Sequence, residues 1–163
     1  MKTVLFLRHG KSDWEADYSG DHERPLAKRG VKAAKRMGRL IEAIGAVPDR
    51  ALTSTAVRAR TTLELAMSAG GWICPVEQLG RLYHASPGIL ISQMRAEPDE
   101  TERLLLVGHE PGWSETIETL IGGGTVRFPT AAFARVDLHI DRWQDADADT
   151  GELKYLMIPK AIG

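Results

Sequence analysis

The sequence has little of several features that would decide its class at once. It contains a single cysteine, Cys74, which excludes an internal disulfide, fits a reducing compartment and is expected near the core as a small apolar residue. No apolar run approaches the roughly 20 residues of a membrane span, and the first residues offer no stretch suited to a signal peptide. The formal net charge of −1 argues against bulk binding to nucleic acid or anionic lipid. We therefore expect a cytoplasmic protein with no nucleic-acid or membrane partner, in which any anion site is a local cluster of cations.

Common signatures of phosphate and metal sites are also missing. The Gly-Gly-Gly run at residues 122–124 lacks the Lys-Ser/Thr pair of a P-loop and the spacing of a dinucleotide fingerprint, so we interpret it as a loop. No set of His, Asp and Glu residues shows a recognised metal-ligand spacing, and we expect neither a metal nor another cofactor. The 163 residues are enough for one domain, residues 1–163, with a sizeable core, but too few for two.

Two short apolar runs stand out against this background. Residues 4–7 (Val-Leu-Phe-Leu) and 104–107 (Leu-Leu-Leu-Val) are unbroken, which is typical of strands buried on both faces of a parallel sheet. The first run ends in Arg-His-Gly (8–10) and the second in Gly-His-Glu (108–110). Open α/β sheets carry their chemistry just beyond the carboxyl ends of the strands. We therefore expect both histidines at one edge of the sheet.

The rest of the chain alternates between helical and strand periodicity. An apolar stripe predicts a helix over about 27–44, ended by Gly45. The other predicted elements are a strand at 49–53, a helix from Ser54 to about 70 with Ser54 as its cap, a strand at 73–76, a helix over about 87–96 capped by Ser86, a helix over about 113–121, a strand around 134–140 with one wet face, and an antiparallel last strand at 153–158. This order predicts a layered α/β domain.

Basic side chains lie mostly off the apolar stripe of the first predicted helix. They are Lys28, Arg29, Lys32, Lys35, Arg36 and Arg39. We interpret them as a solvated outer face rather than as a phosphate or nucleic-acid patch, because positive charge on such a helix needs no ligand.

Parallel strands would deliver three loops to the same sheet edge. Arg8, His9, Arg58 and His109 would then converge, and they would form an anion site that contains a nucleophile. His9, His109 and Glu110 could instead hold a metal, an alternative that we rank below the anion site because their spacing matches no metal motif.

The motifs that carry these residues resemble those of the histidine phosphatase superfamily, which also contains the cofactor-dependent phosphoglycerate mutases. They are Arg-His-Gly (8–10), Ser-Thr-Ala-Val-Arg-Ala-Arg-Thr (54–61) and Val-Gly-His-Glu-Pro-Gly (107–112). The small size, the Arg-Pro-Leu segment (24–26) with Arg-Gly after it (29–30), and Leu-Tyr (82–83) are most similar to the SixA branch of phosphohistidine phosphatases. The resemblance implies a phosphoglycerate mutase-like fold, a three-layer αβα sandwich around a mostly parallel sheet.

The resemblance also implies roles for the converging residues. His9 would be the nucleophile that forms a covalent phosphohistidine, and its other ring nitrogen must donate a hydrogen bond, which we expect a backbone carbonyl to accept. Arg8 and Arg58 would contact the phosphoryl group, with His109 as a further ligand. The expected substrate-binding residues are Arg8, Arg58, His109, Arg24, Gly10 and Ser12.

The general acid is the least defined part of the predicted site. Superfamily members that cleave phosphoesters carry a carboxylate after the third strand, because an alkoxide is a poor leaving group. Here His84 occupies that region, and the alternatives are Glu77, Asp13, Glu110 or no acid at all. An imidazole leaving group, with an unperturbed pKa of about 6.5, needs much less help.

These features favour a metal-independent phosphatase that removes a phosphoryl group from phosphohistidine on a signalling or phosphotransfer protein. Between Tyr83 and Arg103 there is room for one helix and no lid domain, and an open site would admit a protein side chain. The alternatives are a small-molecule phosphomonoester phosphatase with the same site and, from a different class, a non-catalytic phosphate-binding module.

Overall fold

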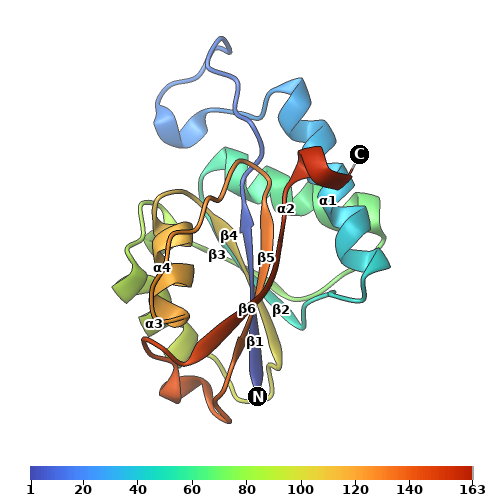
Figure 1. Ribbon diagram of the computed structural model, residues 1–163. Coiled ribbons are helices and arrows are strands. Elements are labelled where there is room, and N and C mark those ends of the chain that lie inside the picture. Colours follow the sequence, from blue (N-terminus) through green and yellow to red (C-terminus); the bar gives the residue numbers. More distant parts are fainter. Residues whose placement is uncertain (163) are drawn as a thin grey trace.

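The two apolar runs form the centre of a six-stranded sheet in the computed structural model, which describes residues 1–162 (Figure 1). The strands are β1 (Lys2–Arg8), β2 (Arg50–Ser54), β3 (Val76–Leu79), β4 (Arg103–Gly108), β5 (Phe133–Leu138) and β6 (Gly151–Met157). Their order across the sheet is β3-β2-β4-β1-β5-β6. The first four strands pair in parallel, whereas β5 runs antiparallel to both of its neighbours. The predicted mostly parallel sheet with an antiparallel ending is confirmed.

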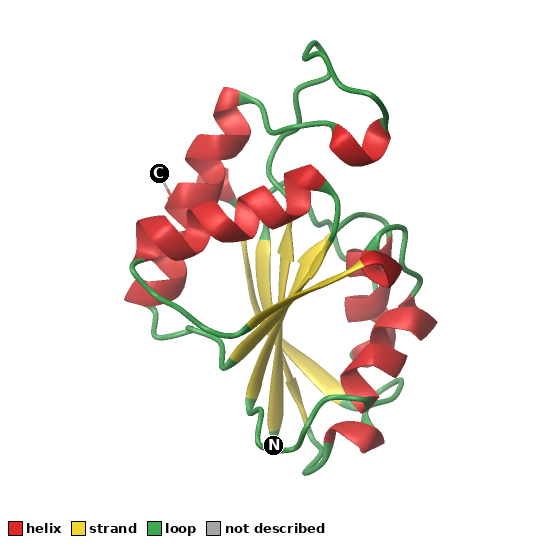
Figure 2. Cartoon of the chain, turned by 180° about the vertical axis from the view of Figure 1, so that it is seen from behind, coloured by secondary structure: helices red, strands yellow, loops and turns green. Residues whose placement is uncertain are grey.

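Helices cover both faces of the sheet, as Figures 1 and 2 show from opposite sides. They are α1 (Lys28–Ala43), α2 (Val57–Gly70), α3 (Pro87–Arg95) and α4 (Gly112–Leu120). The pair α1 and α2 packs on one face and the pair α3 and α4 on the other. The predicted three-layer αβα sandwich is therefore confirmed, and α3 is the only helix of the described chain between Tyr83 and Arg103.

The unbroken apolar run of β1 is explained by this double covering. Leu5 and Leu7 face the cluster under α1 and α2, while Val4 and Phe6 face the cluster under α3 and α4, and all four are fully buried. Burial of each such side chain contributes about 1.5–3 kcal/mol. The end of β1 is thus held firmly, and with it the residues that follow.

Several predicted helix ends are also confirmed. Ser86 caps α3 by accepting a hydrogen bond from the Ile89 N–H at 3.4 Å, and Pro87 is the first helical residue. Gly45 follows α1 with a φ of 69°, a conformation that favours glycine. The helices between residues 1 and 162 are each too short or too polar to cross a bilayer.

The strand that was predicted to have one wet face is largely buried on both. Phe133 in β5 is fully buried against the α1–α2 side, and Asp137 is only 6% exposed, whereas Arg135 is partly exposed and His139, just after β5, is exposed. The prediction is wrong for Phe133 and Asp137, because the polar group of Asp137 is satisfied inside the protein. The Asp137 carboxylate accepts hydrogen bonds from the Thr3 hydroxyl at 2.9 Å and from Nε of Arg135 at 2.8 Å.

The third strand lies three residues later than the predicted range of 73–76. Ile73 is 88% exposed, and the ladder begins only at Val76. The error has a physical reason: β3 is an edge strand with three exposed residues, so its sequence carries no buried apolar run. Glu77 consequently falls inside β3, beside Leu52 of β2, rather than in the loop beyond it.

The predicted cap of the second helix is wrong as well. Ser54 is the last residue of β2, and α2 begins only at Val57 after Ala56. The Ser54 hydroxyl accepts a hydrogen bond from the Ala56 N–H at 3.1 Å and so shapes the turn between strand and helix. Its position at the sheet edge also gives it a second contact, within the site described next.

Candidate active site

The carboxyl ends of β1, β2 and β4 meet at one edge of the sheet, and the predicted residues converge there. The register pairs Arg8 with Gly108 and Thr53 with Val107, so the three loops leave the sheet at the same level. The ring centroids of His9 and His109 lie 5.2 Å apart. The rings line a cavity of about 220 Å³ whose walls are Arg8, His9, Lys11, Ser12, Trp14, Arg24, Arg58, His84, His109, Glu110 and Thr130.

His9 is held in one tautomer by its own loop. Its Nδ1 lies 2.7 Å from the Gly10 carbonyl oxygen, which has no proton, so Nδ1–H is the donor. The expected acceptor is thus the carbonyl of the next residue, and Nε2 keeps its lone pair. The Gly10 N–H donates to the Thr62 hydroxyl at 3.0 Å. Both polar groups of the Gly10 backbone therefore position the loop, and Gly10 is not among the residues that line the cavity.

The absence of a side chain at Gly10 has a steric cause. A Cβ atom there would come within 2.7 Å of the Gly30 carbonyl oxygen, and one at Gly30 would come within 2.2 Å of the Lys11 carbonyl oxygen. The loop after β1 therefore lies directly on the first turn of α1. This contact explains why both positions are glycine.

His109 is bound from the neighbouring strand. Its Nε2 lies 2.8 Å from the Ser54 hydroxyl, and that hydroxyl already accepts the Ala56 N–H. The hydroxyl proton is available to His109, and its donation to Nε2 would place the ring proton on Nδ1. Within residues 1–162 this Nδ1 atom is buried without a hydrogen-bond partner.

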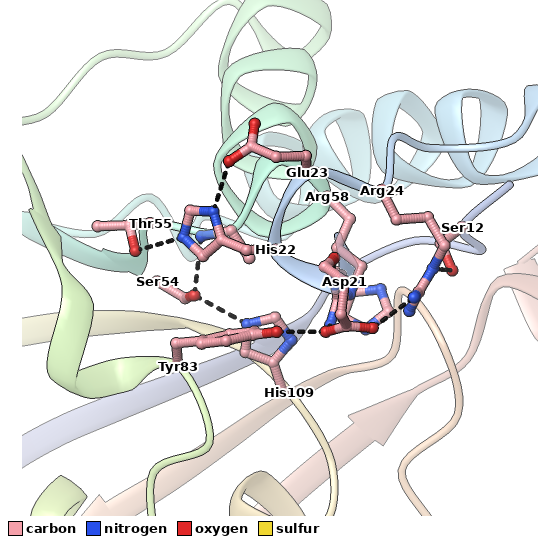
Figure 3. Close-up of polar contacts among 12 residues, drawn as sticks. Ser12, Asp21, His22, Glu23, Arg24, Ser54, Thr55, Arg58, Tyr83 and His109 are labelled. Atoms are coloured by element: carbon pink, nitrogen blue, oxygen red, sulfur yellow. Dashed lines mark hydrogen bonds and ion pairs between the residues drawn. The ribbon is translucent and has the colours of Figure 1, made fainter. Parts of the chain in front are cut away.

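Arg58 is fixed by the loop that follows β1. Its Nη1 donates to the Asp21 backbone carbonyl at 2.7 Å and its Nη2 to the Asp21 carboxylate at 3.0 Å. The same carboxylate accepts hydrogen bonds from Arg24 and from the Tyr83 hydroxyl, so that it lies at the centre of this network (Figure 3). The Tyr83 hydroxyl, followed by Arg24 and Arg58, holds the pKa of the Asp21 carboxyl well below its usual range.

Asp21 and Tyr83 are the site residues that sequence reasoning missed. Asp21 belongs to a polar loop, and the Leu-Tyr pair was noted only as part of a resemblance. A usable signal was present in the spacing, because Asp21 precedes Arg24 by three residues and forms an ion pair with it in a short 3₁₀ segment, Asp21–Glu23. The Tyr83 ring also packs edge-on against His109, with centroids 5.4 Å apart.

Arg24 and Ser12 form the opposite wall of the cavity. Nε of Arg24 donates to the Ser12 hydroxyl at 2.9 Å, and its guanidinium stacks on the Trp14 ring at 3.6 Å from the centroid. Arg24 is only 5% exposed, whereas Trp14 is 62% exposed. Arg8 approaches from the strand end, where its Nη1 donates to the Phe128 carbonyl at 3.1 Å.

The four candidates for a general acid occupy different places. Glu77 lies on β3 in an ion pair with Arg50, and the Asp13 carboxylate accepts a hydrogen bond from the Glu15 N–H at 3.0 Å. Neither of them lines the cavity. His84 and Glu110 do line it. His84 has a φ of 59°, an uncommon conformation for a residue with a side chain.

Glu110 is engaged by the helix that follows it. Its Oε1 accepts the Ser114 N–H at 2.8 Å, and its Oε2 lies 2.8 Å from the Ser114 hydroxyl. The carboxylate thus anchors the first turn of α4, where negative charge is stabilised by the helix dipole. Groups of three or more His, Cys, Asp or Glu side chains arranged to hold a metal are not found within the described part of the chain.

Both histidines are held neutral by their surroundings. Burial lowers the pKa of His9 to about 4, assisted by the nearby charges of Arg58 and Arg8. Burial likewise lowers the pKa of His109 to about 3, with further contributions from His9 and Arg58. Near neutral pH, Nε2 of His9 is therefore unprotonated and able to act as a nucleophile.

The lowered pKa values predict a pH-dependent stability. An unfolded histidine binds a proton below about pH 6.5, whereas folded His9 and His109 stay neutral down to about pH 4. The unfolded chain therefore binds more protons in this window, and the free energy of unfolding falls as the pH falls, by up to about 1.4 kcal/mol per pH unit for each histidine. Urea unfolding in phosphate-free buffer measures the slope.

A matched pair of variants separates this effect from general acid destabilisation. His109→Gln should flatten the slope, whereas His139→Gln, at a side chain that is 61% exposed, should leave it unchanged. Equal slopes in wild type and His109→Gln would contradict the prediction.

Comparisons with known proteins agree with this geometry. Residues 4–121 match the family model of the histidine phosphatase superfamily (branch 1). The uncharacterized protein ML1117 of Mycobacterium leprae is 34% identical over 166 residues, covering 94% of this chain and 100% of that one. A crystal structure from Agrobacterium tumefaciens, assigned as the phosphohistidine phosphatase SixA, is 27% identical with a TM-score of 0.81 and covers 97% of this chain and 98% of that one. The protein histidine phosphatase SixA with tungstate shares the fold at a TM-score of 0.86, with 24% identity and 99% coverage of both chains.

Proposed function

Because the chain belongs to the histidine phosphatase superfamily, with SixA-type structural neighbours, and is a hydrolase acting on phosphoryl groups, we propose that it dephosphorylates phosphohistidine on a protein. The reaction would pass through a covalent intermediate on His9. One observation carries this proposal: the Gly10 carbonyl binds Nδ1–H of His9 and leaves Nε2 unprotonated in a cavity lined by arginines.

The chemical steps follow from this tautomer. Nε2 of His9 attacks the phosphorus in line, the bond from phosphorus to the substrate nitrogen breaks, and that nitrogen takes up a proton. Water then attacks the phosphorus of the His9 adduct, which releases inorganic phosphate and restores the imidazole. Negative charge spreads over the equatorial oxygens in each step, so catalysis depends on the cations placed around them.

Five side chains would bind those oxygens. Arg8 and Arg58 provide permanently charged guanidinium groups that can form paired hydrogen bonds. With the Ser54 hydroxyl donating to Nε2, His109 can donate a hydrogen bond from Nδ1–H while its ring stays neutral. Arg24 and Ser12 would contact the phosphoryl group from the other wall, while Gly10 acts through its backbone on His9.

The choice of phosphohistidine depends on the leaving group. An imidazole leaves with a pKa near 6.5, whereas an alkoxide must be protonated as it departs, a step for which acid catalysis typically contributes about 10²–10⁴-fold. His84 lines the cavity and is exposed, so it can supply a proton to a departing imidazole. Glu110, the one carboxylate among the lining residues, is committed to Ser114 at both oxygens.

That same carboxylate supports a second candidate function. If Glu110 released Ser114 and carried a proton, it could serve as the acid for an alkoxide, and the chain would be a small-molecule phosphomonoester phosphatase. Burial lowers the pKa of Arg8, and Glu110 is near enough to the site to oppose this lowering. A non-catalytic binding module is disfavoured, because a binding site needs no unprotonated Nε2 beside its arginines.

Side-by-side rates distinguish the two enzymes. We expect kcat/KM for a phosphohistidine peptide to exceed that for sugar phosphates by at least ~10²-fold, the typical contribution of an acid that phosphohistidine does not need. Glu110→Gln should change the phosphohistidine rate by less than about threefold and His84→Gln by about tenfold. A preference for sugar phosphates that is lost in Glu110→Gln would establish the second candidate instead.

A further inference from the structure

A second cavity adjoins the candidate active site. It encloses about 450 Å³ between α1 and the C-terminal segment, and it shares Lys11 and Thr130 with the wall of the His9 cavity. Figure 1 shows the C-terminal segment beside α1. We call this cavity the basic groove, and its cations are Lys11, Arg29, Lys32, Arg36 and Lys160.

The five cations of the basic groove form no salt bridges within the described residues. The whole protein has a formal charge of only −1, so the positive charge is a local feature. The first turn of α1 also contains no acidic residue, although negative charge is favoured at a helix N-terminus. Such a concentration of cations opposes folding and is offset when an anionic partner binds.

The lining of the groove indicates the kind of partner. The lining also includes four apolar residues, which are Ala33, Pro129, Ile158 and Pro159. Small inorganic anions would contact the cations but not these apolar residues, whereas a peptide with acidic and apolar side chains would contact both. Because Lys11 and Thr130 line both cavities, the groove lies next to the cavity of His9, and an extended chain with its phosphoryl group at His9 would have flanking residues beside the groove.

We infer that the basic groove binds an acidic segment that flanks the phosphohistidine of a protein substrate. The inference rests on the proposed function, since it extends the same site to the substrate around the reacting residue. It gives part of the basic face of α1 a ligand, which the interpretation as a purely solvated face does not: Lys32 and Arg36 line the groove, and Lys35 and Arg39 lie outside it.

That difference supplies a matched pair of variants. Lys32→Glu/Arg36→Glu and Lys35→Glu/Arg39→Glu each reverse one lysine and one arginine, four residues apart on the same helix. They change the net charge equally, and only the first pair alters the groove. Neither pair belongs to the proposed catalytic residues. Equal midpoints of thermal unfolding would show that both variants are folded.

The substrates are free phosphohistidine and synthetic phosphohistidine peptides with glutamates on one side or the other, together with glutamine versions of the same peptides. For wild type we expect kcat/KM on the better glutamate peptide to exceed that on its glutamine version by about tenfold, an advantage that salt should reduce. Lys32→Glu/Arg36→Glu should remove this advantage and leave the rate on free phosphohistidine unchanged. Lys35→Glu/Arg39→Glu should keep most of it.

Binding of the unphosphorylated glutamate peptide, measured by fluorescence anisotropy, tests the groove without any reaction. If wild type binds this peptide and hydrolyses no phosphohistidine, the proposed function is wrong, but the groove still binds an acidic segment. If glutamate and glutamine peptides behave alike, or if both charge-reversed pairs lose the advantage equally, the inference is overturned. Tighter, groove-dependent binding of tripolyphosphate with no binding of the peptide would overturn it too, in favour of a small polyanion.

Discussion

His9→Gln is expected to reduce turnover of phosphohistidine by on the order of 10⁴-fold or more, because the covalent step loses its nucleophile. The glutamine side chain still reaches into the cavity, and the Gly10 N–H still donates to the Thr62 hydroxyl, so the loop after β1 should keep its place. Arg8, Arg58 and His109 would then bind the substrate phosphoryl group without transferring it. KM for the remaining activity should therefore change far less than kcat.

The covalent intermediate gives this prediction a second measurement. Wild-type protein quenched in alkaline detergent during turnover of labelled substrate should carry the label on His9, and His9→Gln should carry none. His22→Gln is the matched control, since His22 lies near the site and is bound to Thr55 but does not line the cavity. EDTA should leave wild-type turnover unchanged. Label on another residue, or activity that EDTA removes and added metal restores, would refute the role of His9.

The convergence of the site was predictable because two strong signals coincide. The unbroken apolar runs of β1 and β4 mark strands that must be buried on both faces, and buried parallel strands must end at the same sheet edge. The histidine that follows each strand is then brought to the same place, and the two ring centroids lie 5.2 Å apart. Arg58 follows from the same reasoning, as the second residue of the helix after β2.

The features that escaped prediction depend on contacts between distant segments. Asp21, Arg58 and Tyr83 come from three separate segments of the chain that meet above the sheet edge. Ser54 resembles a helix cap in sequence, yet it is the last residue of β2, and its hydroxyl forms a hydrogen bond with His109. The polar pattern of β5 resembles a solvated face, although Asp137 is satisfied by Thr3 across the sheet. In each case a local pattern fits two structures, and tertiary packing decides between them.

Arg58→Lys is expected to lower kcat/KM by about 10²–10³-fold, although it keeps the positive charge. A guanidinium has five N–H donors in a fixed plane, and two of them bind Asp21, one through the backbone carbonyl and one through the carboxylate. Three of the five donors therefore remain for phosphoryl oxygens in the cavity that Arg58 lines. A lysine offers a single mobile ammonium group, which cannot satisfy Asp21 and two phosphoryl oxygens together. Arg60→Lys, two residues along the same helix and bound only to the Thr55 carbonyl, should change kcat/KM by less than about twofold.

The same contacts make Asp21 a positioning residue for Arg58. Asp21→Asn keeps the shape of the side chain and loses the charge-assisted hydrogen bonds, so we expect a loss of about tenfold in kcat/KM. If Asp21 acts through Arg58, the double variant should be no slower than Arg58→Lys alone, since the guanidinium that Asp21 orients is already gone. Multiplied losses in the double variant would show instead that Asp21 acts through Arg24 or Tyr83, its other two partners. A structural role alone would lower the midpoint of thermal unfolding in proportion to the loss of activity, and the two measurements together decide between these outcomes.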